Sequence, residues 1–243
     1  RVTANYDGIT LLSSVNNVVS GNLISSNSYD GITLLSSVNN VVSGNTVTNN
    51  YDGISLFYSS NNLISNNTIT NNNYGISLYS SNNIIYFNNF NNTYQVWSDS
   101  LNVWDDEDEG NYWSDYNGTD LYIGPNQNMI GSDGIGDTPY FIDENNVDNY
   151  PLMGVFSDFI VSLDEETYHV TTICNSTISK FGFEIGVETG NRLIRFNVTG
   201  KDSAVGFCRI LIPTALMNYP HIVLVSSNEI IPTLLDVSNE TYA

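Results

Sequence analysis

The chain has 243 residues, of which 26 are acidic and 6 are basic, and its formal charge at neutral pH is −20. A surface of this charge offers no basic patch to neutralise phosphates, so nucleic acids and anionic lipids are poor partners, whereas cations are favoured. No run of 18 apolar residues predicts a membrane-spanning helix, and no secretory signal peptide is recognisable.

The N-terminal part of the chain is repetitive. Two copies of the repeat, residues 6–22 and 29–45, are identical over 17 residues. A glycine followed by Ile recurs at spacings of 23, 22 and 22 residues, at Gly8, Gly31, Gly53 and Gly75. A fixed period of this length is typical of a solenoid, in which one unit buries its apolar face only by stacking on copies of itself.

Four apolar columns align among the copies and predict the interior. Two of them lie two residues apart within a copy, which is the period of a β-strand. The columns are Ile9, Ile32, Ile54 and Ile76; Leu11, Leu34, Leu56 and Leu78; Val19, Val42, Ile64 and Ile85; and Ile24, Val47, Ile69 and Phe90. Because Ser, Asn and Gly corners separate them, each copy predicts three short strands that form one turn of a parallel β-helix.

Asparagine supplies two further columns. An Asn at an inward corner can bond the backbone of its own turn and the same Asn one turn away, which satisfies polar groups that a tight bend would orphan. We therefore predict two asparagine ladders; the alternative is that these residues only form turns in a low-complexity segment. The ladders comprise Asn17, Asn40, Asn62 and Asn83, and Asn22, Asn45, Asn67 and Asn88.

Because of these aligned columns, residues 1–93 resemble the right-handed parallel β-helix repeat of the carbohydrate-binding and sugar-hydrolase family and of its NosD-like relatives. The copies predict about four turns. Tyr86 and Phe87 replace small polar residues of earlier copies, so we expect a cap at that end. Arg1 begins partway through a turn, and we expect the chain to be a trimmed part of a longer protein.

Beyond the repeats, aromatic and acidic residues gather, including five consecutive acids at residues 105–109. The motifs Gly-Asn-Tyr-Trp-Ser-Asp-Tyr, from Gly110, and Asp-Gly-Ile-Gly-Asp-Thr-Pro-Tyr, from Asp133, resemble the module that follows NosD-like β-helices in archaeal surface proteins. We therefore expect an irregular acidic and aromatic cap over residues 94–156. Its large aromatic side chains either plug the end of the helix or stack on sugar rings. These are Trp104, Trp113 and Tyr116.

The second motif also offers a candidate calcium site. Asp133 and Asp137 flank two glycines, so the loop can direct two carboxylates and a carbonyl at one hard cation, with Asp115 as a third ligand. Against this, the loop lacks the early acidic positions of an EF-type site, and such Asp turns often bond their own backbone. Calcium is the predicted cofactor.

Residues 157–243 contain short strand-like stretches separated by turn residues, which predicts a small antiparallel β-sandwich. The stretches 176–181, 195–200 and 206–213 resemble an archaeal extracellular β-domain that follows this cap. Cys174 and Cys208 lie here, and we predict a disulfide between them; two buried free thiols are the alternative.

Six N-x-Ser/Thr sequons support an extracellular setting weakly, because a chain so rich in Asn produces several by chance. The sequons begin at Asn66, Asn91, Asn117, Asn175, Asn197 and Asn239.

Converging catalytic groups are scarce. Asp7, Asp30 and Asp52 form a column with a spacing of roughly 4.8 Å per turn, and paired carboxylates can serve glycoside hydrolysis. However, residues 2–93 contain no Lys or Arg, and a repeated Tyr-Asp-Gly is more simply a turn in which Asp bonds the corner backbone. We expect no enzyme activity.

Copper delivery, which the NosD resemblance raises, is also disfavoured. Soft and imidazole ligands suit copper, and those of this chain are few and scattered, so no copper is expected. They are His169, His221, Met129, Met153 and Met217, besides the cysteines.

We therefore expect an extracellular structural or adhesive protein of the archaeal cell surface, in an envelope layer, fibre or stalk, which associates with copies of itself. The chief rival is a module that binds cell-surface glycans. Such a module would use the stripes Tyr6, Tyr29 and Tyr51, and Asp7, Asp30 and Asp52.

Overall fold

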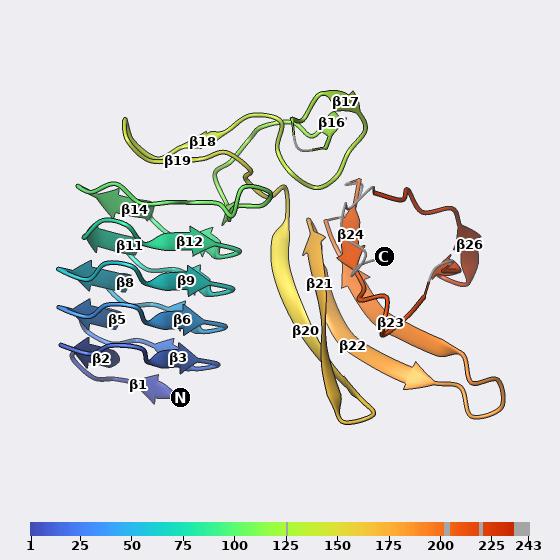
Figure 1. Ribbon diagram of the computed structural model, residues 1–243, viewed down its shortest axis with the longest axis horizontal. Helices are drawn as coiled ribbons and strands as arrows, with labels where there is room; N and C mark the ends of the chain where they lie inside the picture. Colours follow the sequence, from blue (N-terminus) through green and yellow to red (C-terminus); the bar gives the residue numbers. More distant parts are fainter. Residues whose placement is uncertain (125, 202–204, 219–220, 236–243) are drawn as a thin grey trace. The chain divides into compact units, whose positions relative to one another are not determined.

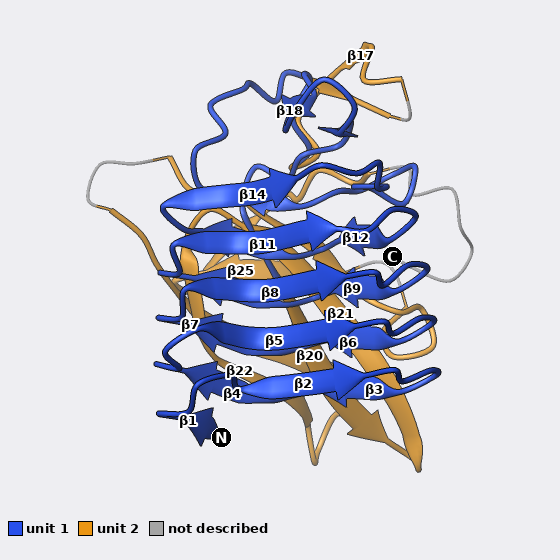
Figure 2. Cartoon of the chain, turned by 90° about the vertical axis from the view of Figure 1, so that its left-hand side faces the viewer, with its two compact units in different colours: residues 1–121, 135–156 blue, residues 122–134, 157–243 orange. Residues whose placement is uncertain are grey.

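The computed structural model describes residues 1–124, 126–201, 205–218 and 221–235, which form strands, turns and irregular segments (Figure 1). The chain divides into two compact units, residues 1–121 with 135–156 and residues 122–134 with 157–243 (Figure 2). The predicted all-β fold and parallel β-helix are confirmed. The helix has about five turns, rather than the four expected.

Three parallel sheets form the sides of the β-helix, and their strands lie one above another in Figure 1. The first contains β1 (Val2–Thr3), β4 (Leu23–Ser25), β7 (Thr46–Thr48), β10 (Thr68–Thr70), β13 (Asn89–Asn91) and β15 (Tyr112–Trp113). The second contains β2 (Ile9–Leu12), β5 (Asp30–Leu35), β8 (Asp52–Phe57), β11 (Tyr74–Tyr79) and β14 (Tyr94–Ser98). The third contains β3 (Val18–Ser20), β6 (Val41–Ser43), β9 (Leu63–Ser65) and β12 (Ile84–Tyr86).

Parallel pairing continues beyond residue 93, where the sequence period ends. Strand β14 pairs with β11, and β15 pairs with β13. The segment expected to be an irregular cap therefore contributes a further partial turn before it becomes irregular. The remaining strands of the first unit are the antiparallel pair β18 (Tyr140–Phe141) and β19 (Val147–Asp148).

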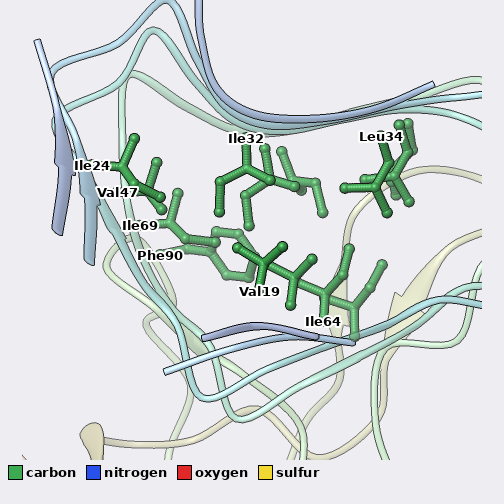
Figure 3. Close-up of a cluster of buried hydrophobic side chains, with 14 of the residues drawn as sticks. Val19, Ile24, Ile32, Leu34, Val47, Ile64, Ile69 and Phe90 are labelled. Atoms are coloured by element: carbon green, nitrogen blue, oxygen red, sulfur yellow. The ribbon is translucent and has the colours of Figure 1, made fainter. Parts of the chain in front are cut away.

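The interior is filled by the predicted apolar columns. Ile32, Leu34, Val42 and Val47 are fully buried, and equivalent residues of successive turns stack on one another (Figure 3). The repeated glycine is required by close approach: a Cβ on Gly31 would lie 2.4 Å from a methyl carbon of Val47. Any larger residue there would separate two sides of the helix.

Both predicted asparagine ladders are present. In the second ladder, the backbone N–H and side-chain Nδ2 of Asn45 both donate to Oδ1 of Asn67, each at 3.0 Å. The Nδ2 group of Asn67 in turn donates to the backbone carbonyls of Val42 and Ser65, at 2.9 and 3.0 Å. Each buried amide thus satisfies the backbone of two turns.

The structure also contains ladders that we did not predict. Asn27, Asn50 and Asn72 form a third asparagine ladder, with N–H to Oδ1 distances of 3.0 and 2.9 Å between successive members. A serine ladder includes Ser37 and Ser59, in which the Ser37 N–H donates to Ser59 Oγ at 2.9 Å. The corners of every turn are therefore tied to the next by side chains.

The described residues of the second unit form three antiparallel pairs and a three-stranded sheet. Side chains from the sheet β20–β21–β24 and from the pair β22–β23 share one apolar core around Val161, Val170 and Leu216, as expected of a sandwich. The strands are β16 (Tyr122–Ile123), β17 (Met129–Ile130), β20 (Val155–Leu163), β21 (Glu166–Cys174), β22 (Thr177–Ile185), β23 (Arg192–Thr199), β24 (Cys208–Leu211), β25 (Val223–Val225) and β26 (Asn228–Ile230).

The ladder predicts a large cost for removing one interior amide. Asn67→Ala removes the acceptor of the Asn45 backbone N–H and the Nδ2 donor to the buried carbonyl of Val42, so the free energy of unfolding should fall by about 3 kcal/mol or more. Asn22→Ala, at the half-exposed start of the same column, is the matched control and should cost about 1 kcal/mol. Urea denaturation followed by circular dichroism measures both, and equal costs would contradict the ladder.

Candidate functional site

The three tyrosines of the proposed glycan stripe form a stacked row. The Tyr6 and Tyr29 rings lie 5.4 Å apart with planes 8° apart, and the Tyr29 and Tyr51 rings lie 5.6 Å apart with planes 10° apart. Tyr74 meets Tyr51 edge-on, at 6.2 Å with planes 63° apart, and stacks on Tyr94 at 5.1 Å. A sugar ring stacks on an aromatic face, and neighbouring tyrosines already cover both faces of Tyr29. The middle of the stripe therefore presents a ring edge and a hydroxyl.

The three aspartates of the stripe form the expected column. Asp30 and Asp52 are register partners on β5 and β8, and the backbone N–H of Asp30 donates to Asp7 at 3.3 Å. Asp30 is only 2% exposed and Asp52 only 8%. Carboxylates this deeply buried are not available to a glycan or to a glycosidic bond.

Each buried carboxylate has one satisfied and one unsatisfied oxygen. Oδ2 of Asp30 accepts a hydrogen bond from Thr33 at 2.9 Å, and Oδ2 of Asp52 accepts one from Ser55 at 3.1 Å. Among the described residues, Oδ1 of each has no hydrogen-bond partner. Two negative charges at adjacent register positions would also repel.

Burial, together with the smaller effects of the Asp52 and Asp7 charges, raises the pKa of Asp30 to about 6, against hydrogen bonds from Thr33 and Ser55 that lower it. Burial also raises the pKa of Asp52. A carboxyl whose pKa is higher in the folded state stabilises that state fully below its unfolded value near 4. This stabilisation is lost as the pH rises through the folded value.

The melting temperature should therefore fall between pH 4 and pH 6. Asp30→Asn replaces this carboxyl by a neutral amide, so it should reduce this fall and raise the melting temperature at pH 7 by roughly 2–4 °C. The raised pKa values of Asp52 and Asp148 leave part of the pH dependence in place. Asp7→Asn, at the half-buried start of the column, should leave most of the pH dependence in place. Thermal denaturation at several pH values tests this, and an unchanged pH dependence in Asp30→Asn would contradict it.

The three predicted calcium ligands are each engaged in local hydrogen bonds. Asp137 accepts from the Leu121 N–H at 2.9 Å, and Asp115 accepts from the Tyr140 hydroxyl at 3.2 Å. Asp133, which belongs to the second unit, accepts from Gln127 at 3.0 Å. Within the described ranges, no three His, Cys, Asp or Glu side chains are grouped as metal ligands. Calcium binding stays a prediction.

The cap ends the ladders, and its two key residues were not identified from the sequence. Asn146 accepts the last N–H of the first ladder, from Asn102, at 3.0 Å. Asp148 accepts the last N–H of the second, from Asn111, at 2.8 Å. Nothing in the sequence marks these acceptors, because they follow the last repeat at irregular distances.

The cap tryptophans are buried and act as a plug. Trp113 stacks between Phe90, at 4.6 Å, and Tyr140, at 4.4 Å, and its Nε1 donates to Asp148 at 2.8 Å. Trp104 donates to the same Asn146 oxygen that ends the first ladder. Tyr116 donates to the Thr138 carbonyl at 2.6 Å. Burial raises the pKa of Asp148 to about 7, against the hydrogen bonds donated to it.

The two cysteines are brought together. Cys174 is buried and Cys208 is half-buried, and they are direct register partners on β21 and β24. Both are free thiols in this structure, with no disulfide between them. Paired residues of antiparallel strands lie about 4.5–5.5 Å apart between Cα atoms, within the range of a disulfide. A hydrogen bond from Cys208 lowers the pKa of Cys174, which favours the reactive thiolate. The disulfide stays a prediction.

Oxidation should join these cysteines without rearranging the strands. Titration of free thiols in the denatured protein should give none after mild oxidation and both after reduction. Reduction should also lower the melting temperature, and Cys208→Ser should make that temperature insensitive to reductant. Two titratable thiols after oxidation would contradict the pairing.

The sequons differ in accessibility. Asn91, Asn117 and Asn197 are exposed, whereas Asn66 is half-buried. Asn175 is exposed, but its side chain bonds the backbone of Val205 and Phe207. Asn239 lies outside the described residues.

Comparison with known proteins identifies the N-terminal region. The family model described as "Periplasmic copper-binding protein (NosD)" matches residues 1–118. No curated protein matches the chain, and no solved structure does. Together with the parallel sheets, this match shows that residues 1–118 form a NosD-like β-helix repeat region.

The residues of the matched region do not fit a thiolate, thioether or imidazole copper site. Residues 1–118 contain no His, Cys or Met, and these side chains are the ones that suit copper best. Outside that region, His169 pairs with Asp158 at 2.8 Å.

The described residues include no helix with the length and hydrophobicity of a membrane span.

Proposed function

We propose that this protein is an extracellular structural or adhesive component of an archaeal cell surface and that it associates with copies of itself. The observation that carries the proposal is the continuous set of side-chain ladders, which ties every turn to the next. A stack tied in this way resists bending and separation of its turns, as a rod, fibre or stalk requires.

The capped end of the β-helix also supports a structural role. The cap accepts the last ladder donors through Asn146 and Asp148 and covers the last apolar turn with Trp104 and Trp113. Such a cap prevents strand addition at that end. The archaeal and extracellular setting is supported by the resemblance of the cap motifs, and the absence of enzyme activity remains part of the proposal.

Glycan binding by the stripes is the weaker alternative. It is weaker because Tyr29 has a stacked ring on each side and because Asp30 and Asp52 are buried.

Self-association is expected to use the surface of a turn, since each turn already pairs with a nearly identical one. Val41 donates its N–H to the Asn17 carbonyl of the preceding turn at 2.9 Å, and Val18 is its register partner one turn earlier. The N–H of Val18 is therefore directed at any turn that stacks on the first.

The test is whether this N–H supports assembly. Because the cap closes the other end, light scattering and electron microscopy at high protein concentration should show copies joined through their first turns. This association should form in calcium and, if calcium is not required, also in chelator. Val18→Pro removes the donor and should abolish this association, whereas Val18→Thr keeps the donor and the shape and should not. A monodisperse monomer in both buffers would overturn the proposal.

A further inference from the structure

A small pocket lies in the first unit where β14 meets the cap. Its volume is about 170 Å³. Thr93, Tyr94 and Gln95 line it from β14 and the residue before it, and Asp115 and Tyr140 line it from the cap. No Lys or Arg is among its lining residues.

Both tyrosines of the pocket have one face supported by the protein. Tyr94 ends the tyrosine row and stacks on Tyr74 at 5.1 Å, while Tyr140 stacks on Trp113 at 4.4 Å. The only other described ring near Tyr140, that of Tyr116, meets it edge-on at 71°. Each ring therefore keeps a second face on which no described ring stacks, unlike Tyr29.

The polar groups of the pocket are mainly acceptors. The Tyr140 hydroxyl already donates to both oxygens of Asp115, at 3.2 Å each. Burial raises the pKa of Tyr140, and the Asp115 charge raises it further, so the phenol stays protonated and neutral. The Nε2 group of Gln95 already donates to Ser114 at 3.0 Å. A carboxylate and aromatic faces remain for a ligand.

We propose that this pocket binds an alkylammonium group, such as a quaternary ammonium head group. A cation beside a carboxylate and over tyrosine faces gains charge attraction and cation–π interaction. The group needs few hydrogen-bond donors from the protein, which matches a pocket whose Tyr140 and Gln95 donors are already engaged. The volume suits one trimethylammonium group, and the charge of −20 raises the local concentration of cations.

Choline and its neutral carbon analogue, dimethylbutanol, provide a matched pair of probes. They have nearly the same shape and differ in charge, so comparing them separates cation binding from apolar binding. Binding to the intact chain is measured at about 0.15 M salt by calorimetry or from backbone amide shifts in nuclear magnetic resonance spectra. Choline should bind saturably and the analogue at least about tenfold more weakly.

Variants assign the binding to the pocket. Tyr94→Leu and Asp115→Asn should each weaken choline binding about tenfold. Tyr29→Leu, which changes a ring whose faces Tyr6 and Tyr51 cover, is the control and should leave it unchanged. Asp115→Asn can still accept from Tyr140, so its effect does not depend on tolerance of the larger change at Tyr94.

Three results would overturn the proposal. They are equal binding of choline and dimethylbutanol, unchanged choline binding in both pocket variants, and the absence of saturable choline binding by a folded wild-type chain.

Discussion

Buried asparagine amides are the constraint on which the rest of this structure depends. A solenoid with turns of 22 or 23 residues must bend its backbone sharply several times per turn, and each bend directs N–H and carbonyl groups toward the interior. An amide that both donates and accepts can satisfy two turns at once. Asn67 does so for Asn45, Val42 and Ser65. The apolar columns can stack without voids only because these corners are satisfied.

The same constraint explains why the cap has its particular residues. A ladder that simply stopped would leave the donors of Asn102 and Asn111 buried without acceptors, at about 1–3 kcal/mol each. Asn146 and Asp148 accept those donors, and the indole N–H groups of the two cap tryptophans complete the same acceptors. The cap thus ends the hydrogen-bond ladders and the apolar core together, which agrees with an architectural role.

The sequence predicted those features that repeat. The apolar columns and two asparagine ladders follow directly from the period, and the third ladder was predictable as well, since Asn27, Asn50 and Asn72 share the same spacing. The acceptors at the cap were not predictable, because no period connects Asn146 to Asn102. The sequence did not predict that Asp30 is buried, because Asp before Gly usually forms an exposed turn. In this structure the Thr33 hydroxyl donates a hydrogen bond to the Asp30 carboxyl group, which allows it to be buried.

Exchange of the asparagine side-chain amide hydrogens with deuterated water, followed by nuclear magnetic resonance, tests the central claim most directly. Protection should be low for Asn22 at the half-exposed start of the second ladder and high for Asn45, Asn67 and Asn88. For these three, exchange should require an opening that costs close to the global free energy of unfolding. Equally fast exchange of all four amides would contradict the account.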